Sequence, residues 1–223
     1  MSYCLVPITS SELLCLVGQD FVAKFQKEID PVICPLRRHI ALGRPASMGK
    51  ELWEYAVADS ITGGVWCGAG KGIVDVSIGG DVGIDVKSVQ IGKHTTTEAS
   101  MYQPLASQAE ASIDFSNRNK QALWNLFVNG WVKKVSGIKE YYMLTIFRNH
   151  NFDCSMAGFR VHNIDMEFRE ESCEFTKKSM KINSIIDPQL ANIKAYLSKT
   201  RLEIRVTDKV FNDPNYTMKI YQF

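Results

Sequence analysis

Two aspartates and a lysine lie close together in a segment with the pattern of a β-hairpin. Asp75 is followed ten residues later by Asp85-Val86-Lys87, and Gly79-Gly80-Asp81 lies between two runs rich in β-branched residues. Glycine readily adopts the positive φ that tight turns need, so residues 71–89 are predicted to form two antiparallel strands. A three-residue loop at this position places Asp75 opposite Asp85.

The expected hairpin brings charged groups onto one face. Side chains alternate along a strand, so Lys87 shares the face of Asp85. Directly opposed carboxylates repel each other, and a divalent cation is the simplest compensation. The two carboxylates and the backbone carbonyl of Val86 are hard oxygen ligands that suit Mg²⁺. The apolar side chains expected on the opposite face are Val74, Val76, Ile84 and Val86.

This set of groups suits phosphodiester hydrolysis. A bound Mg²⁺ lowers the pKa of a water ligand and neutralises charge that builds on the phosphate. Lys87 can orient or deprotonate the attacking water. Proton abstraction and acyl transfer fit less well, because no Ser/His or Cys/His arrangement accompanies the two acids.

A helix expected before the hairpin offers a third acid. Ser47 is predicted to cap this helix, which continues to about Ile61 and stops at Gly63-Gly64. At 100° per residue, Glu54 lies at the border of the apolar face, whereas Glu51 lies on the far side. Glu54 is therefore the candidate that looks toward the hairpin, with a plain surface glutamate as the alternative.

The glycine-rich segment before the hairpin does not match a phosphate-binding loop. In Gly68-Ala69-Gly70-Lys71-Gly72 the last glycine replaces the required Ser or Thr, and a strand rather than a helix is expected to follow. No nucleotide cofactor is therefore expected.

The run GIVDVSIGGDVGIDVKSV, together with the preceding helix, resembles the PD-(D/E)xK motif of type II restriction endonucleases. The resemblance implies that Asp75 and Asp85 are metal-binding acids and that Lys87 is the catalytic lysine. It also implies Mg²⁺ as cofactor and a central mixed sheet flanked by helices. Cleavage would leave 5′-phosphate and 3′-hydroxyl ends. Val74 stands where the family often has proline.

Two polar segments are candidates for DNA contact. Lys93-His94-Thr95 follows the hairpin and offers donors for phosphate or base edges. Arg148-Asn149-His150-Asn151 lies between two apolar runs, and Arg and Asn can pair bidentately with guanine and adenine. Arg37-Arg38-His39, expected in a loop, could contact phosphate. For all three segments an ordinary solvated loop is the alternative.

The order of expected elements predicts an α/β (α+β) fold. A central mixed β-sheet flanked by helices and a restriction-endonuclease-like core are expected. Residues 1–223 are predicted to be a single nuclease domain, with an N-terminal helical segment at 1–46, a catalytic core at 47–164 and a C-terminal elaboration at 165–223. The other expected elements are a helix at 10–28 with a capping box at Thr9–Glu12 and ended by Pro31 and Pro35, a helix at 114–134, strands at 141–147 and 156–164, a helix at 187–198, and strands at 201–211 and 216–223.

Composition narrows the class of protein further. The net charge is only +2, but residues 1–111 carry 9 basic and 12 acidic side chains, whereas residues 112–223 carry 17 and 12. A basic second half suits a polyanionic ligand. The six scattered cysteines contain no CxxC pair, which argues against structural zinc and favours a reducing compartment. With no signal peptide and no apolar run of membrane length, a cytoplasmic protein of a bacterial or archaeal cell is expected.

Together these features predict a type II restriction endonuclease that uses Mg²⁺ to cut double-stranded DNA at a specific sequence. A homodimer is expected, because two-fold symmetry in the DNA is met most simply by two-fold symmetry in the protein. Recognition elements would be part of the same domain. Two alternatives stay open: a repair or junction-resolving nuclease of the same fold, and a DNA-binding protein without catalysis.

Overall fold

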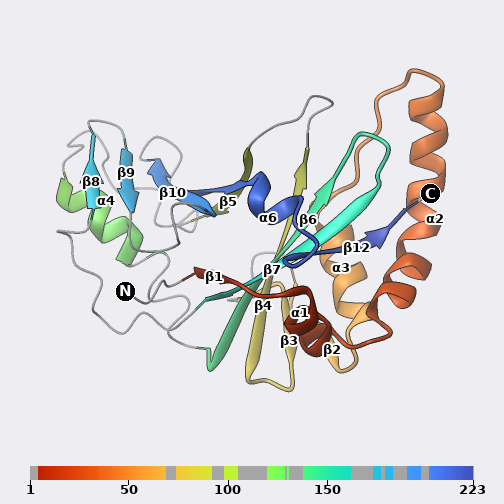
Figure 1. Cartoon of the computed structure of the whole chain (residues 1–223), viewed down its shortest axis with the longest axis horizontal. Helices are drawn as coiled ribbons and strands as arrows, with labels where there is room; N and C mark the ends of the chain where they lie inside the picture. The colour runs from red at the N-terminus through yellow and green to blue at the C-terminus, as the bar shows by residue number, and fades with distance from the viewer. Residues whose placement is uncertain are drawn as a thin grey trace.

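The computed structural model describes most of the chain, and its described part contains two β-sheets with helices packed against them (Figure 1). The described residues are 5–68, 74–91, 98–104, 120–128, 130, 138–161, 173–176, 179–182, 190–196 and 201–222.

The first sheet carries the hairpin and is mixed. Its strand order is β1-β7-β6-β4-β3-β2, and β12 also pairs with β7. β4 and β6 run parallel, whereas the other pairs are antiparallel, so the predicted mixed sheet is confirmed. The strands are β1 (Leu5–Pro7), β2 (Gly64–Trp66), β3 (Val76–Ile78), β4 (Val82–Gln90), β6 (Glu140–Arg148), β7 (Cys154–Val161) and β12 (Thr217–Tyr221).

Three helices cover one face of this sheet, which we call the helical face: α1 (Ser10–Val17), α2 (Phe21–Ala41) and α3 (Lys50–Ser60). Figure 1 shows α2 and α3 side by side at the right. The predicted capping box of α1 is confirmed, because the Thr9 hydroxyl accepts from the Glu12 amide while the Glu12 carboxylate accepts from the Thr9 amide. Core side chains from the three helices meet Val76, Ile84 and Val86 of the hairpin.

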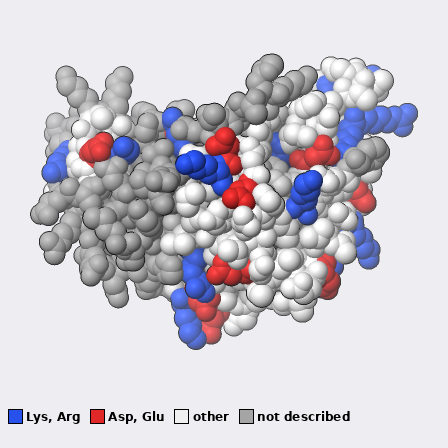
Figure 2. Space-filling view, viewed as in Figure 1, with Lys and Arg blue, Asp and Glu red and all other residues white. Residues whose placement is uncertain are grey.

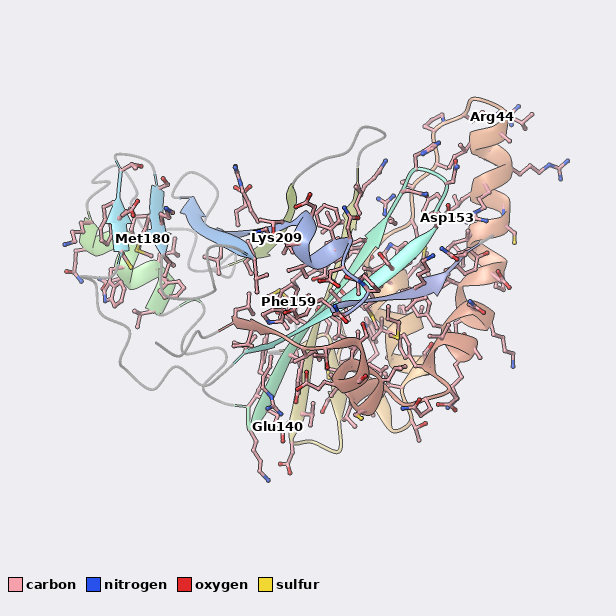
Figure 3. All side chains as sticks on the ribbon, viewed as in Figure 1. Arg44, Glu140, Asp153, Phe159, Met180 and Lys209 are labelled. Carbon is pink, nitrogen blue, oxygen red and sulfur yellow. The ribbon has the colours of Figure 1, made fainter. Side chains whose placement is uncertain are left out.

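A second, five-stranded sheet shares a hydrophobic core with the opposite face, which we call the inner face. The labelled side chains of Phe159 and Met180 in Figure 3 belong to this core. This second sheet was not predicted. Its strand order is β5-β11-β10-β9-β8. The elements are β5 (Glu98–Pro104), β8 (Cys173–Phe175), β9 (Ser179–Ile182), β10 (Ala191–Tyr196) and β11 (Arg201–Thr207), with α4 (Lys120–Phe127) and α6 (Asp208–Phe211) beside them.

The prediction of a single helix ending before Pro31 was wrong. The chain breaks at Gly18 and then continues as α2 through both Pro31 and Pro35. The two prolines are four residues apart and exposed, so the carbonyls that lose their amide partners face water. Burial of an apolar side chain is worth about 1.5–3 kcal/mol, and the stripe on the opposite side outweighs two interior prolines at about 3 kcal/mol each. The stripe consists of Phe21, Phe25, Ile29 and Ile33.

Three further expectations were wrong in part or in whole. Arg37-Arg38-His39 lies in the last turns of α2 and not in a loop. Within the helix expected at 187–198, residues 191–196 form strand β10, which pairs with β9 and β11 on its two sides; 187–189 and 197–198 lie outside the described residues. Its residues alternate between apolar and polar from Ala191 to Lys194, and that period suits a strand flanked by two neighbours. The strand expected at 201–211 ends at Thr207, where α6 begins.

Other boundaries differ by a few residues. α3 begins after Gly49 rather than at Ser47, and β2 is a short edge strand that was not predicted. The strands expected at 141–147 and at 216–223 are confirmed as β6 and β12. The strand expected at 156–164 is confirmed as β7 up to Val161, and 162–164 lie outside the described residues. Within the helix expected at 114–134, the structure describes α4; residues 114–119, 129 and 131–134 lie outside the described part.

None of the helices in the described ranges has the length and apolar character required to cross a lipid bilayer.

The hairpin follows the predicted register. Val76 pairs with Ile84 and Ile78 with Val82, while Gly79 and Gly80 have φ values of 60° and 80° in the connecting turn. Val74 departs from the prediction: it packs toward the inner face and not toward the helical face. The reason is that β3 begins only at Val76, so strict alternation does not extend back to Val74.

Gly83 is the residue against which Val74 packs. A β-carbon at Gly83 would lie 2.7 Å from Val74 Cγ1 and 2.9 Å from Ile138 Cδ1. We expect Gly83→Ala to lower the free energy of unfolding by about 1–3 kcal/mol, the usual cost of overpacking, as measured by urea denaturation. Ser77→Ala, on the paired strand, is the control and should change it by less than about 0.5 kcal/mol. Equal stability of Gly83→Ala and wild type would contradict this packing.

Candidate active site

The hairpin register brings Asp75, Asp85 and Lys87 together. The Asp75 amide donates to the Ile84 carbonyl at 3.0 Å, which extends the pairing beyond β3 and sets Asp75 beside Asp85. The Lys87 ammonium lies 3.6 Å from Asp85 Oδ2 and 3.8 Å from Asp75 Oδ2. Asp85 and Lys87 are buried, with 1% and 8% of their surfaces exposed. The predicted convergence of two carboxylates and a lysine is therefore present.

Asp75 lies just before β3, between β4 and the end of β2: its amide donates to the Ile84 carbonyl and its carbonyl accepts from the Cys67 amide. Its Oδ2 accepts a hydrogen bond from the Val86 amide at 2.8 Å, so the carboxylate lies where a continued strand would otherwise pair. The amide and carbonyl of one strand residue point to the same side, and the Val86 carbonyl is therefore directed to the edge that Asp75 occupies. Two side-chain carboxylates and one backbone carbonyl thus approach the same edge of β4.

Helix α3 brings a third carboxylate to the site. Glu54 is 1% exposed, whereas Glu51 is exposed, so the choice of Glu54 as the inward-facing acid is confirmed. Glu54 Oε2 accepts from the indole nitrogen of Trp66 at 3.3 Å. The helix approaches from the helical face, and Glu54 consequently lies on the other side of Asp75 from Lys87.

Lys50 connects the helix to the hairpin, and sequence reasoning missed it. Its ammonium lies 2.6 Å from Glu54 Oε1 and 3.7 Å from Asp75 Oδ1. The four-residue spacing between Lys50 and Glu54 was the only signal, and it is common in surface ion pairs. Asp75 therefore contacts one lysine on each side.

Burial controls the electrostatics of these groups. Burial raises the pKa of Asp75, Lys87 lowers it and the Asp85 charge raises it again, with a net increase. Burial lowers the pKa of Lys50, but the hydrogen bond to Glu54 and the charges of Asp75, Glu54 and Asp85 outweigh that effect and raise it overall. The protonated ammonium of Lys50 is thus favoured, while the negative charge of Asp75 is not fully compensated.

Tyr141 adds a buried phenol beside Asp85. It is paired with Gly83 in the parallel β4–β6 ladder and therefore lies on the inner face, next to Asp85. Burial, followed by the charge of Asp85, raises the pKa of Tyr141 well above its usual value. Its hydroxyl makes no hydrogen bond of good geometry to any described group, although Asp85 is near enough to affect it.

The residues present fit a hard divalent cation. Among the described residues, no three or more His, Cys, Asp and Glu side chains form a ready metal cluster. Asp75 and Asp85, with the Val86 carbonyl, supply instead the small oxygen set typical of Mg²⁺ sites that retain several waters. Burial and the Asp85 charge raise the pKa of Asp75, and a bound cation would oppose both effects.

The structure describes only one of the two predicted DNA-contact segments. Lys93, His94 and Thr95 lie outside the described residues. The segment Arg148–Asn151 joins β6 to β7 at the end of the sheet toward which β4 runs (Figure 1).

The side chains of this second segment are partly engaged. Arg148 donates to Ser88 and Gln90, and its guanidinium lies over the Phe152 ring. Asn149 bonds to Asp153 and to two amides of its own loop. His150 is half-buried and Asn151 is exposed.

A cavity of about 670 Å³ lies elsewhere, between the start of β7, α6 and β12. Its lining includes Asp153, Phe211 and Lys219 and none of the four acidic and basic groups around Asp75. The candidate site lies instead around Asp75, whose side chain is 15% exposed, with Asp85, Lys87 and Glu54 buried beside it.

Comparisons with protein-family models, with curated proteins and with solved structures found no match for this chain.

The raised pKa of Asp75 predicts a stability effect. Ionisation of Asp75 destabilises the folded state as the pH rises through the raised pKa; below the unfolded-state value of about 3.9 both states are protonated. Without divalent ions at pH 7, we expect Asp75→Asn to melt at a higher temperature than wild type, by about 2–4 °C per kcal/mol gained. The gain should shrink toward pH 4, as followed by circular dichroism.

Asp81→Asn is the matched control, because Asp81 is an exposed acid of the same hairpin and pairs with Lys139 at 3.4 Å. It should melt at the wild-type temperature at each pH. A lower melting temperature for Asp75→Asn at pH 7 would show that the carboxylate stabilises the fold and would contradict the prediction.

Proposed function

We propose that the protein is a Mg²⁺-dependent endonuclease that hydrolyses phosphodiester bonds of double-stranded DNA at specific sequences, in the manner of type II restriction endonucleases. The observation that carries the proposal is the position of the Lys87 ammonium, within 4 Å of both Asp75 and Asp85 on adjacent strands. The same residues carry the resemblance to the PD-(D/E)xK motif, and α3 with its buried Glu54 precedes them as that resemblance implies.

The chemistry follows from the charges of the residues. Asp75 and Asp85, with the Val86 carbonyl, would hold the Mg²⁺, which when bound polarises the phosphate and acidifies a water. Lys87 would orient the attacking water and counter the negative charge that builds on the phosphate oxygens. The Val86 amide keeps the Asp75 carboxylate in place through its 2.8 Å hydrogen bond. Water attack forms the new P–O bond as the bond to the 3′ oxygen breaks.

Exposed basic side chains favour an anionic polymer as the substrate. Basic side chains lie near the same end of the sheet as the β6–β7 loop, at the end of α2. Arg38, His39 and Arg44 are exposed there, and Arg44 extends away from the body of the molecule in Figure 3. Figure 2 shows this basic end at the upper right.

Sequence-specific reading requires an oriented loop, and α2 supplies an anchor. Arg37 donates to the Asn151 carbonyl and to Asp153 Oδ1, so the loop bearing Arg148 and His150 is fixed to the helix. We propose that phosphate contacts come from the end of α2 and base contacts from this loop, with Lys93, His94 and Thr95 as further candidates. A homodimer would supply a second site for the second strand of a palindrome.

Removing the charges of the site should stop cleavage without stopping binding. Asp85→Asn and Lys87→Ala should each reduce cleavage at least about 100-fold, because groups that stabilise transition-state charge are worth that much or more. Plasmid DNA with Mg²⁺ should give discrete fragments with wild type, and gel shifts should show DNA binding by all variants. Asp81→Asn, in the turn of the same hairpin, should cut as wild type does.

Full activity of Asp85→Asn or Lys87→Ala would reject the assignment of the site. Nicks or cuts that depend on DNA structure would indicate the repair or junction-resolving alternative. Binding that is unaffected by EDTA, with no cleavage under any condition, would indicate a DNA-binding protein without catalysis.

The basic end of α2 can be tested separately through salt dependence. Arg38→Ala with Arg44→Ala should weaken DNA binding similarly for all sequences and reduce the slope of log Kobs against log salt by about 0.9 for each lost phosphate contact. Lys139→Ala, at the hairpin-turn end of the sheet, is the control and should leave the slope unchanged. An unchanged slope in the double variant would show that the basic end of α2 does not contact the DNA phosphates.

A further inference from the structure

The Lys50 ammonium occupies a cation position between two acids of the site. It lies 2.6 Å from Glu54 Oε1 and 3.7 Å from Asp75 Oδ1, and it reaches them from the first turn of α3. We propose that Lys50 takes the place of a second divalent cation, so that each site binds one metal ion, at Asp75 and Asp85. This inference rests on the proposed function and concerns the number of metal ions in it.

The burial of Glu54 is the first reason. A fully buried carboxylate needs a compensating charge, and Glu54 is 1% exposed. Lys50 supplies that charge, while the Trp66 indole bonds to the other carboxylate oxygen. A metal ion bound to Glu54 Oε1 would therefore have to displace the Lys50 ammonium, which lies 2.6 Å from that oxygen.

The geometry at Asp75 is the second reason. The distance of 3.7 Å between Lys50 Nζ and Asp75 Oδ1 exceeds a hydrogen bond, so Lys50 does not use the lone pairs of this oxygen. Oδ2, in contrast, accepts from the Val86 amide. Asp75 can thus bind one metal ion together with Asp85 without displacing Lys50.

The balance of charge is the third reason. The carboxylates of Glu54, Asp75 and Asp85 exceed the ammonium groups of Lys50 and Lys87 by one negative charge. One divalent ion leaves the site with one positive charge, which matches the single negative charge of a phosphodiester. A second divalent ion beside Lys50 would raise the charge of the site to three positive charges, two more than a single phosphodiester neutralises.

A surface pair on α2 provides the contrast. Lys24 lies 2.7 Å from Asp20 with the same four-residue spacing, but this acid has 57% of its side chain exposed. The Lys24 ammonium also donates to Thr62 and contacts no group of the site. The spacing alone is therefore an ordinary helix pair, and the burial of Glu54 distinguishes Lys50.

The number of bound Mn²⁺ ions tests the proposal. With the full-length chain in the absence of DNA, titration followed by electron paramagnetic resonance of free Mn²⁺ should give one ion per wild-type chain. Lys50→Met vacates the position between Glu54 and Asp75, and this variant should bind two. Lys50→Arg keeps the charge and should bind one, as should the matched control Lys24→Met.

Two outcomes would overturn the proposal: two ions bound by wild type, or a single ion bound by Lys50→Met. Lys50→Met leaves Glu54 without its charge partner, so circular dichroism must show that the variant is folded. If it is not, the double variant Lys50→Met/Glu54→Gln replaces it. This variant removes both charges of the pair and lacks the third carboxylate, so it should bind one ion; two ions would overturn the proposal.

Cleavage measured on the same wild-type sample separates this inference from the proposed function. Cleavage with two bound ions overturns the inference alone. One bound ion without cleavage of any DNA overturns the proposed function alone. No bound Mn²⁺ in the wild type overturns both.

Discussion

The site depends on carboxylates that are buried at closer range than their charges favour. Asp75 and Asp85 are opposed across a hairpin, and Glu54 is buried one helix away. A lysine on either side of Asp75 offsets part of this repulsion. Charge pairing therefore adds to the apolar packing that holds the hairpin against α3, and burial still raises the pKa of Asp75.

Local rules were enough to predict the centre of the site. The glycines of the turn set the register from Val76 to Ile84, which brings Asp75 close to Asp85, and the period of α3 selected Glu54 over Glu51. Each of these inferences needs only a few neighbouring residues. The mixed character of the first sheet could also be predicted, since the apolar runs at β6 and β7 have the length and continuity of doubly buried strands.

The failures arose where distant parts of the chain decide the outcome. α2 continues through Pro31 and Pro35 because its buried stripe packs on the sheet, which no local propensity reveals. β10 forms a strand because β9 and β11 pair with its two edges. Lys50 was missed because its importance lies in the burial of Glu54 and in the reach of Asp75 across the sheet edge, and both are properties of the tertiary structure.

The hydrogen bonds from Arg37 attach the β6–β7 loop to α2. Arg37 holds the loop at one end of the helix, and nearer the other end Phe25 stacks on Trp53 of α3 with ring centroids 6.4 Å apart. Trp53 immediately precedes Glu54. One helix of 21 residues therefore contacts both the candidate DNA-reading loop and the turn of α3 that carries Glu54.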